Sequence, residues 1–281
     1  MIYYVNAKGI GRKIAVILNN PYIIYRKLLK LLGVGSFKFK LDLDLLSNPK
    51  YAYCLYYAAI QAKALGINKI SAIEFGVAGG AGLVELEELA EMIKIETGIE
   101  TDIYGFDMGS GMPEVSDYKD IPYVWQKGFF KMDIPKLESR LKKSKLIIGN
   151  VAETVGKFIE EYKPAPIGFI SFDMDYYSST INAFRLFDNK NEYFLPRPFC
   201  YFDNTVGDEW AFLSEFHGES LAIKEFNEAN TDRKIGRVTG LRFKRIIESE
   251  WNENIYMLHL FKHPLYDKYI YPNKNCQLPL D

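Results

Sequence analysis

The chain of 281 residues carries 35 Lys and Arg against 36 Asp and Glu, a formal net charge of −1. This balance lacks the basic excess of nucleic-acid-binding proteins, so nucleic acid is not an expected partner. With 48% hydrophobic and 25% charged residues, the composition is that of a globular protein and excludes wholesale disorder.

The N-terminal part, residues 1–50, is predicted to be a helical extension that ends at Ser47-Asn48-Pro49. Its apolar run 14–18 is too short to span a membrane. Basic residues interleave Tyr22 to Leu32, which predicts an amphipathic helix that packs on the domain, contacts a partner or attaches to a membrane surface. The extension is also a candidate contact for a homodimer.

The main domain is predicted over residues 51–263. It begins with a helix at 51–65 and continues as apolar runs that alternate with segments of helical period, which favours a parallel sheet covered on both faces. The expected strands are 70–75, 102–107, 145–149, 167–173 and 199–203, and the expected helices are 82–96, 151–162 and 179–187.

Three further segments complete the prediction. Residues 108–144 form an insertion too long for an ordinary connection, which suggests a lid. Residues 209–230 are expected to be helical, and 238–245 and 255–261 to form a closing pair of strands. The expected fold is therefore α/β, doubly wound and Rossmann-like, with a mostly parallel seven-stranded sheet, an antiparallel closing strand and a surface tail at 264–281.

The cysteines indicate a cellular compartment. Cys54, Cys200 and Cys276 lie far apart and show neither metal-ligand spacing nor a disulfide framework. A reducing, cytoplasmic location is the expectation that follows.

The first strand ends in a glycine-rich turn, Glu74-Phe-Gly76-Val-Ala-Gly79-Gly80-Ala-Gly82. Glycine lets a backbone approach a ligand closely because it has no Cβ. A dinucleotide-binding turn has the pattern Gly-x-Gly-x-x-Gly, but Ala78 stands at its second glycine. The turn instead resembles the first motif of class I S-adenosylmethionine-dependent methyltransferases.

This resemblance implies S-adenosylmethionine as cofactor, with Glu74 and the glycines at 76, 79, 80 and 82 around its methionine end and ribose. Asp107 ends the second strand, where an acid can accept hydrogen bonds from ribose hydroxyls, and Met108 could flank the adenine. Asn150 and Val151 follow the third strand at the position where the family contacts the adenine edge, although Asn150 is equally suited to cap the next helix.

Acidic residues end the next two strands. Asp173 and Asp175 are two residues apart, and Asp203-Asn204 follows the fifth strand. Two carboxylates at this spacing point the same way on a strand, so their repulsion needs a cation or hydrogen-bond donors. Carboxylate and amide oxygens from neighbouring strand ends make a site suited to Mg²⁺.

Asp203-Asn204 resembles the metal pair of catechol and caffeoyl-CoA O-methyltransferases. The run Asp173-x-Asp175-x-Tyr177-x-Ser179-Thr180 resembles the acidic motif of macrocin O-methyltransferase-like enzymes, which methylate sugar hydroxyls. Together these resemblances imply Asp175, Asp203 and Asn204 as metal ligands and Asp175 or Asp173 as the proton acceptor. The catechol-type match would place Asp173 on the metal instead, and Asp173 could also approach the amino group of the cofactor.

The predicted function is transfer of a methyl group from S-adenosylmethionine to a hydroxyl of a small molecule or sugar, with Mg²⁺ assisting. Two alternatives stay open at this stage. One is a nucleotide-dependent oxidoreductase, against which the missing Gly-x-Gly-x-x-Gly counts, and the other is a catalytically silent binding or scaffold protein that keeps the cofactor cleft.

Overall fold

The computed structural model describes residues 22–207 and 210–272 and contains one seven-stranded sheet with the order β3-β2-β1-β4-β5-β7-β6. The first five strands pair in parallel, and β7 runs antiparallel to both β5 and β6. This arrangement confirms the predicted fold class. The strands are β1 (Lys69–Phe75), β2 (Glu100–Asp107), β3 (Lys145–Ile148), β4 (Ile167–Phe172), β5 (Phe194–Phe202), β6 (Arg233–Arg237) and β7 (Ile255–Leu260).

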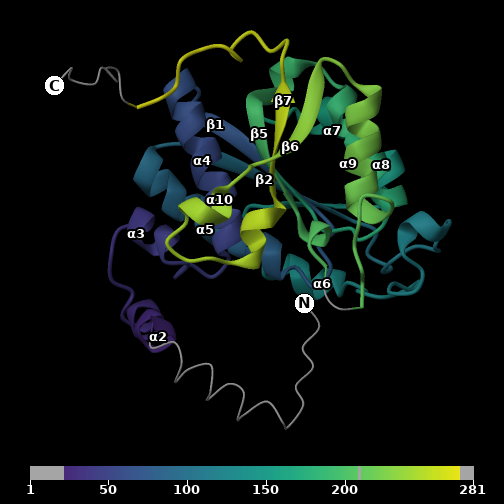
Figure 1. The fold of residues 1–281 in the computed structure, drawn as a ribbon, viewed down its shortest axis with the longest axis horizontal. Helices are drawn as coiled ribbons and strands as arrows, with labels where there is room; N and C mark the ends of the chain where they lie inside the picture. Colours follow the sequence, from purple (N-terminus) through teal and green to yellow (C-terminus); the bar gives the residue numbers. More distant parts are fainter. Residues whose placement is uncertain (1–21, 208–209, 273–281) are drawn as a thin grey trace.

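Helices cover both faces of the sheet, so that the core consists of two apolar clusters (Figure 1). One face carries α4 (Pro49–Leu65) and α5 (Ala81–Thr97), and the other carries α7 (Val151–Tyr162), α8 (Tyr177–Phe184) and α9 (Gly218–Ala229). Strand β4 is buried along its whole length. Among the described residues, no helix is both long and apolar enough to cross a membrane.

Helix α4 shows how local sequence sets these boundaries. The side chain of Asn48 accepts a hydrogen bond from the backbone N–H of Tyr51, and Pro49 occupies the first turn, where its missing N–H costs nothing. Gly66 ends the helix with a φ of +80°, a conformation that glycine adopts without strain. The predicted break at Ser47-Asn48-Pro49 is therefore a helix start.

Two late predictions are wrong. The expected strand at 238–245 does not form, because Gly240 takes a φ of +78° and starts the short helix α10 (Leu241–Lys244). The edge strand β6 lies earlier, and its single fully buried residue, Ile235, gives a weak strand pattern. The helix expected at 209–230 begins only at Gly218, whose φ of +57° marks a turn.

The N-terminal segment is fastened to the domain by a buried ion pair. Residues 1–21 of the predicted extension and 273–281 of the predicted tail lie outside the described residues. Within the described part, α2 (Tyr22–Leu32) and α3 (Phe37–Asp42) precede α4. Arg245 donates to the Asp44 carboxylate at 2.7 Å, with both side chains at most 5% exposed. Asp44 also accepts hydrogen bonds from Ser249 and the Trp251 indole.

We predict that Arg245→Met lowers the free energy of unfolding by about 3–5 kcal/mol, because it leaves the Asp44 carboxylate buried without its partner. The matched control is Arg242→Met, which removes an exposed ion pair with Glu248 and is expected to cost less than about 1 kcal/mol. Urea denaturation of the two variants measures the difference, and equal effects would contradict the assigned role of the buried pair.

Candidate functional site

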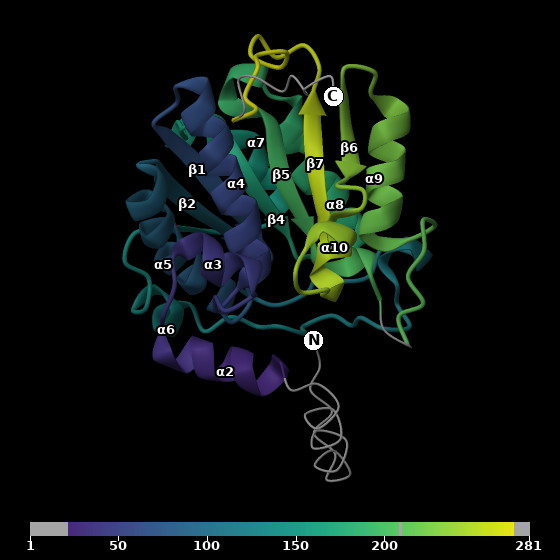
Figure 2. The same ribbon diagram turned by 60° about the vertical axis from the view of Figure 1, so that its left-hand side comes forward.

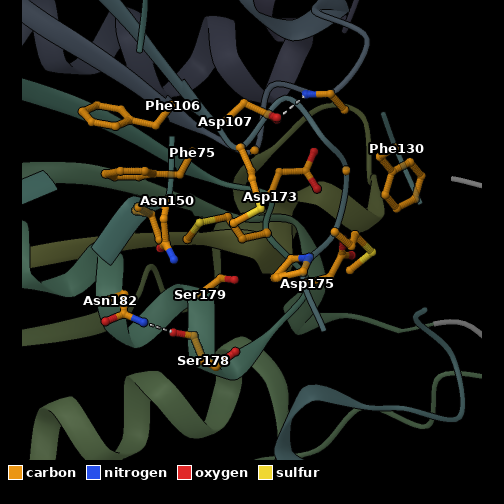
Figure 3. A pocket seen from close by; sticks show the side chains of 18 of the residues that line it. Phe75, Phe106, Asp107, Phe130, Asn150, Asp173, Asp175, Ser178, Ser179 and Asn182 are labelled. Carbon is orange, nitrogen blue, oxygen red and sulfur yellow. Dashed lines mark hydrogen bonds between the residues drawn. The ribbon is translucent and has the colours of Figure 1, made fainter. Parts of the chain in front are cut away.

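A pocket of about 410 Å³ lies at the carboxyl ends of β1, β2, β4 and β5 (Figure 3). This is the edge at which open α/β sheets bind ligands. The insertion contributes Met112, Trp125 and Phe130 to the wall, and the start of α8 contributes Ser178, Ser179 and Asn182. Its volume suits a small-molecule site.

The glycine turn after β1 forms one side of this pocket. Gly76 has a φ of +85°, and a Cβ added there would lie 1.8 Å from the carbonyl oxygen of Asp173. Glycine is therefore required for β1 and β4 to end side by side. Gly80 also takes a positive φ, +76°, and starts α5, where a Cβ would clash with Leu137.

The structure brings six of the predicted cofactor residues to the pocket wall. Asp107 is the most constrained of these: its Oδ2 accepts hydrogen bonds from the backbone N–H groups of Val77 and Ala78, and its Oδ1 accepts one from Gly109. Asn150 has both expected features, because it lines the pocket and its side chain caps α7. The six are Gly76, Asp107, Met108, Asn150, Val151 and Asp173.

The other four predicted cofactor residues, Glu74, Gly79, Gly80 and Gly82, are not on the pocket wall. Glu74 lies behind the turn on the α4 side, 3% exposed, where its Oε1 accepts a hydrogen bond from the Tyr51 hydroxyl at 2.7 Å. Burial raises the pKa of Glu74 to about 8. Gly82 leaves room for this carboxylate, since a Cβ there would lie 2.1 Å from Glu74 Oε1.

The same pocket is also lined by the acidic cluster, which we define as Asp173, Asp175, Asp203 and Asn204. All four predicted residues therefore meet in one place. Burial and the charges of Asp203 and Asp175 raise the pKa of Asp173, and burial and the charge of Asp203 raise the pKa of Asp175 to about 7. Asp175 also has a φ of +61°, a strained backbone conformation of the kind concentrated at functional sites.

Lys50, which the sequence analysis missed, holds Asp203 from outside the pocket. Its ammonium group lies 2.7 Å from Asp203 Oδ1, and the Tyr201 hydroxyl donates to the same oxygen at 2.5 Å. Asn254 donates to the Asp203 backbone carbonyl at 3.1 Å. Although burial opposes them, the Lys50 charge and the hydrogen bonds from Lys50 and Tyr201 lower the pKa of Asp203.

Glu219, which the sequence analysis also missed, holds the backbone of Asn204. It is fully buried in the first turn of α9, and its Oε2 accepts a hydrogen bond from the Asn204 backbone N–H at 3.0 Å. The Asn204 side-chain nitrogen is buried without a hydrogen-bond partner. A buried amide in this state is available to a ligand in the pocket.

The insertion at 108–144 is fastened over this site through Asp120. This fully buried carboxylate accepts hydrogen bonds from the backbone and hydroxyl of Ser178 at 2.8 and 2.9 Å, and also from Ser116. The insertion is therefore tied to the start of α8, three residues after the strained backbone of Asp175.

No protein-family model matches this sequence, and no match is found among curated proteins. Among solved structures, CalS11, described as a calicheamicin methyltransferase, is 20% identical, with a TM-score of 0.50 over 76% of this chain and 81% of its own. The O-methyltransferase NovP is 10% identical, with a TM-score of 0.51 over 75% of this chain and 80% of its own. The chain therefore has the doubly wound fold of these methyltransferases.

We predict that Gly76→Ala destabilises the protein by about 2 kcal/mol or more, because a side chain at positive φ is strained and the new Cβ meets the Asp173 carbonyl. Gly79→Ala is the matched control in the same turn: its Cβ meets nothing within 4 Å, and its φ is not positive. Thermal unfolding compares the variants, and a Gly76→Ala protein as stable as Gly79→Ala would rule out the close approach of β1 and β4.

Proposed function

We propose that this chain is an S-adenosylmethionine-dependent O-methyltransferase acting on a hydroxyl of a small molecule or sugar. One observation carries the proposal: a single pocket is lined both by the Gly76 turn with Asp107 and by the acidic cluster. A nucleoside site and a polar site for a reacting hydroxyl thus share one cavity. The fold that the chain shares with CalS11 and NovP supports the proposal.

The cofactor's nucleoside is assigned to the side of the pocket formed by β1, β2 and β3. Asp107 uses three hydrogen bonds to hold the turn, and a carboxylate has about four acceptor positions, so it can still accept from a ribose hydroxyl. Met108, Asn150 and Val151 then flank the adenine. Glu74 acts on the turn through its contact with Gly82 and not directly on the nucleoside.

The acceptor hydroxyl is assigned to the acidic cluster. Methyl transfer from a sulfonium is an in-line displacement, so alignment of the two reactants supplies much of the catalysis. Asp173 or Asp175 is suited to take the hydroxyl proton, because the raised pKa of each carboxyl makes it a better base than an ordinary aspartate. Trp125 and Phe130 of the insertion supply aromatic surface to the wall of the same pocket.

A divalent cation fits the acidic cluster by its chemistry. Burial and the charges of neighbouring carboxylates raise the pKa values of Asp173 and Asp175, and a cation would relieve the repulsion between these carboxylates. Asp175, Asp203 and Asn204 would hold Mg²⁺, which when bound would lower the pKa of the acceptor hydroxyl. In the described part of the chain, no set of three or more His, Cys, Asp or Glu side chains is arranged for a metal, and the proposed set has only two such residues.

Calorimetric titration with S-adenosylhomocysteine tests the cofactor assignment. We expect binding at one site per chain and, for Asp107→Asn, an affinity at least about tenfold lower, because the turn loses a charged acceptor for two N–H groups. Asp102→Asn, at the solvent-exposed start of the same strand, is the control and should bind within twofold of wild type. Binding of NAD in place of S-adenosylhomocysteine would favour the oxidoreductase alternative.

Binding of Mn²⁺ as a probe for Mg²⁺, followed by electron paramagnetic resonance, tests the metal assignment. We expect Asp175→Asn to weaken Mn²⁺ binding by at least about tenfold and Asp173→Asn to retain it while losing methyl transfer. The reverse result would place Asp173 on the metal. The scaffold alternative would be favoured if the wild-type chain bound S-adenosylhomocysteine but methylated no acceptor, and if neither variant nor Asp203→Asn changed Mn²⁺ binding.

A further inference from the structure

Helix α2 exposes an apolar face that no other described part of the chain covers. Among the side chains of α2 from position 24 onward, Leu29 is the one that is buried, and it lines a small groove with Leu45, Leu46 and Leu89. Arg26 donates to the carbonyl oxygens of Leu43 and Asp44. These contacts fix which side of α2 faces the domain. Five apolar side chains of α2 are left 50–83% exposed, namely Ile24, Tyr25, Leu28, Leu31 and Leu32.

The spacing of these residues makes them one continuous stripe. Ile24, Leu28 and Leu31 stand at i, i+4 and i+7, which is one face of a helix. Lys27 and Lys30 are exposed. At about 3.6 residues per turn, Lys27 borders the stripe beside Leu31, and Lys30 lies one step further round the helix. A helix with a bare apolar stripe bordered by cations is the arrangement found in helices that lie in a membrane interface.

Charge is unevenly distributed along the chain, and the part that contains α2 is the basic part. Residues 1–41 contain eight Lys and Arg and no Asp or Glu, whereas the remaining residues contain 27 basic and 36 acidic side chains. The end of the chain that carries α2 is therefore strongly basic although the whole protein is nearly neutral. Such an asymmetry indicates an anionic partner for that end alone.

We propose that α2 docks this protein on an anionic lipid surface, with the Ile24–Leu32 stripe inserted among the lipids and Lys27 and Lys30 against the headgroups. A second copy of the chain fits the same face less well. In a symmetric dimer the same patch lies on both sides of the contact, so the lysines of one copy would approach those of the other. The proposal does not depend on the proposed methyl transfer.

The position of α2 supports this orientation. Figures 1 and 2 show α2 at the same end of the molecule as α6 (Ile134–Glu138), which belongs to the insertion beside the pocket. The insertion adds exposed aromatic side chains at this end, among them Tyr118, Tyr123 and Phe129. Aromatic residues are favoured at the boundary between lipid and water.

Sedimentation of the full chain with vesicles tests the proposal. We expect binding to vesicles of equal parts phosphatidylcholine and phosphatidylglycerol, little binding to pure phosphatidylcholine, and weaker binding at high salt. Lys27→Gln and Lys30→Gln should each lower the partition coefficient about fivefold. Leu28→Asn with Leu31→Asn should lower it at least about tenfold.

The matched control is Ile95→Asn, which removes an 87% exposed apolar side chain from α5, outside the stripe, and should leave vesicle binding unchanged. Circular dichroism checks that the variants fold. Failure of the wild-type chain to bind anionic vesicles overturns the proposal. Light scattering then shows what covers the stripe: a dimer that Leu28→Asn with Leu31→Asn dissociates would assign it to a second copy, and a monomer would assign it to another segment of the same chain.

Discussion

Repulsion among three carboxylates at one end of the sheet is the constraint on which this site depends. Asp173, Asp175 and Asp203 are brought together because β4 and β5 are adjacent parallel strands, and burial keeps water from screening their charges. Bringing three buried carboxylates together costs free energy, and the protein offsets only part of that cost. Lys50 neutralises Asp203, and Asp173 and Asp175 are left with raised pKa values, which is a state prepared for a proton or a cation.

Two consecutive residues at the start of α4 connect the acidic cluster with the glycine turn. Lys50 reaches the Asp203 carboxylate at the end of β5, and Tyr51 donates to Glu74 near the end of β1. Ser171 of β4 donates to the same tyrosine hydroxyl at 2.8 Å. The start of α4 thus positions one acidic side chain of the pocket, Asp203, and the Glu74 carboxylate behind the glycine turn. The preceding segment, tied down by Arg245 and Asp44, keeps that helix start in place.

The elements of the parallel sheet were predictable because their signals are local. Buried parallel strands are continuous apolar runs, and Asn48, Pro49 and Gly66 are local signals for the ends of α4. The acidic cluster could be predicted for the same reason, since its members directly follow two such strands. The strand at 238–245 was wrong because β6, at the edge of the sheet, buries little and carries almost no apolar pattern.

What could not be predicted depends on contacts between distant residues. Lys50 lies 153 positions from Asp203, and Glu219 lies 15 positions beyond Asn204 across an irregular segment. The sequence also could not predict which face of β1 carries the Glu74 side chain, for a different reason. Strand β1 is buried on both faces from Ile70 onward, so the alternation that normally separates the faces of a strand is absent.

The uneven distribution of charge connects the site with the N-terminal helix. The pocket contains acidic side chains, whereas α2 carries Arg26, Lys27 and Lys30 and no acidic residue. Figure 2 shows α2 at the end of the molecule where β1, β4 and β5 reach their carboxyl ends. An acidic pocket alone would repel an anionic surface at short range. Because α2 is basic and lies at the same end of the molecule, an approaching anionic surface would first meet positive charge and be attracted. Docking through α2 would therefore turn the pocket end of the sheet towards the lipid, in spite of the charge that the pocket carries.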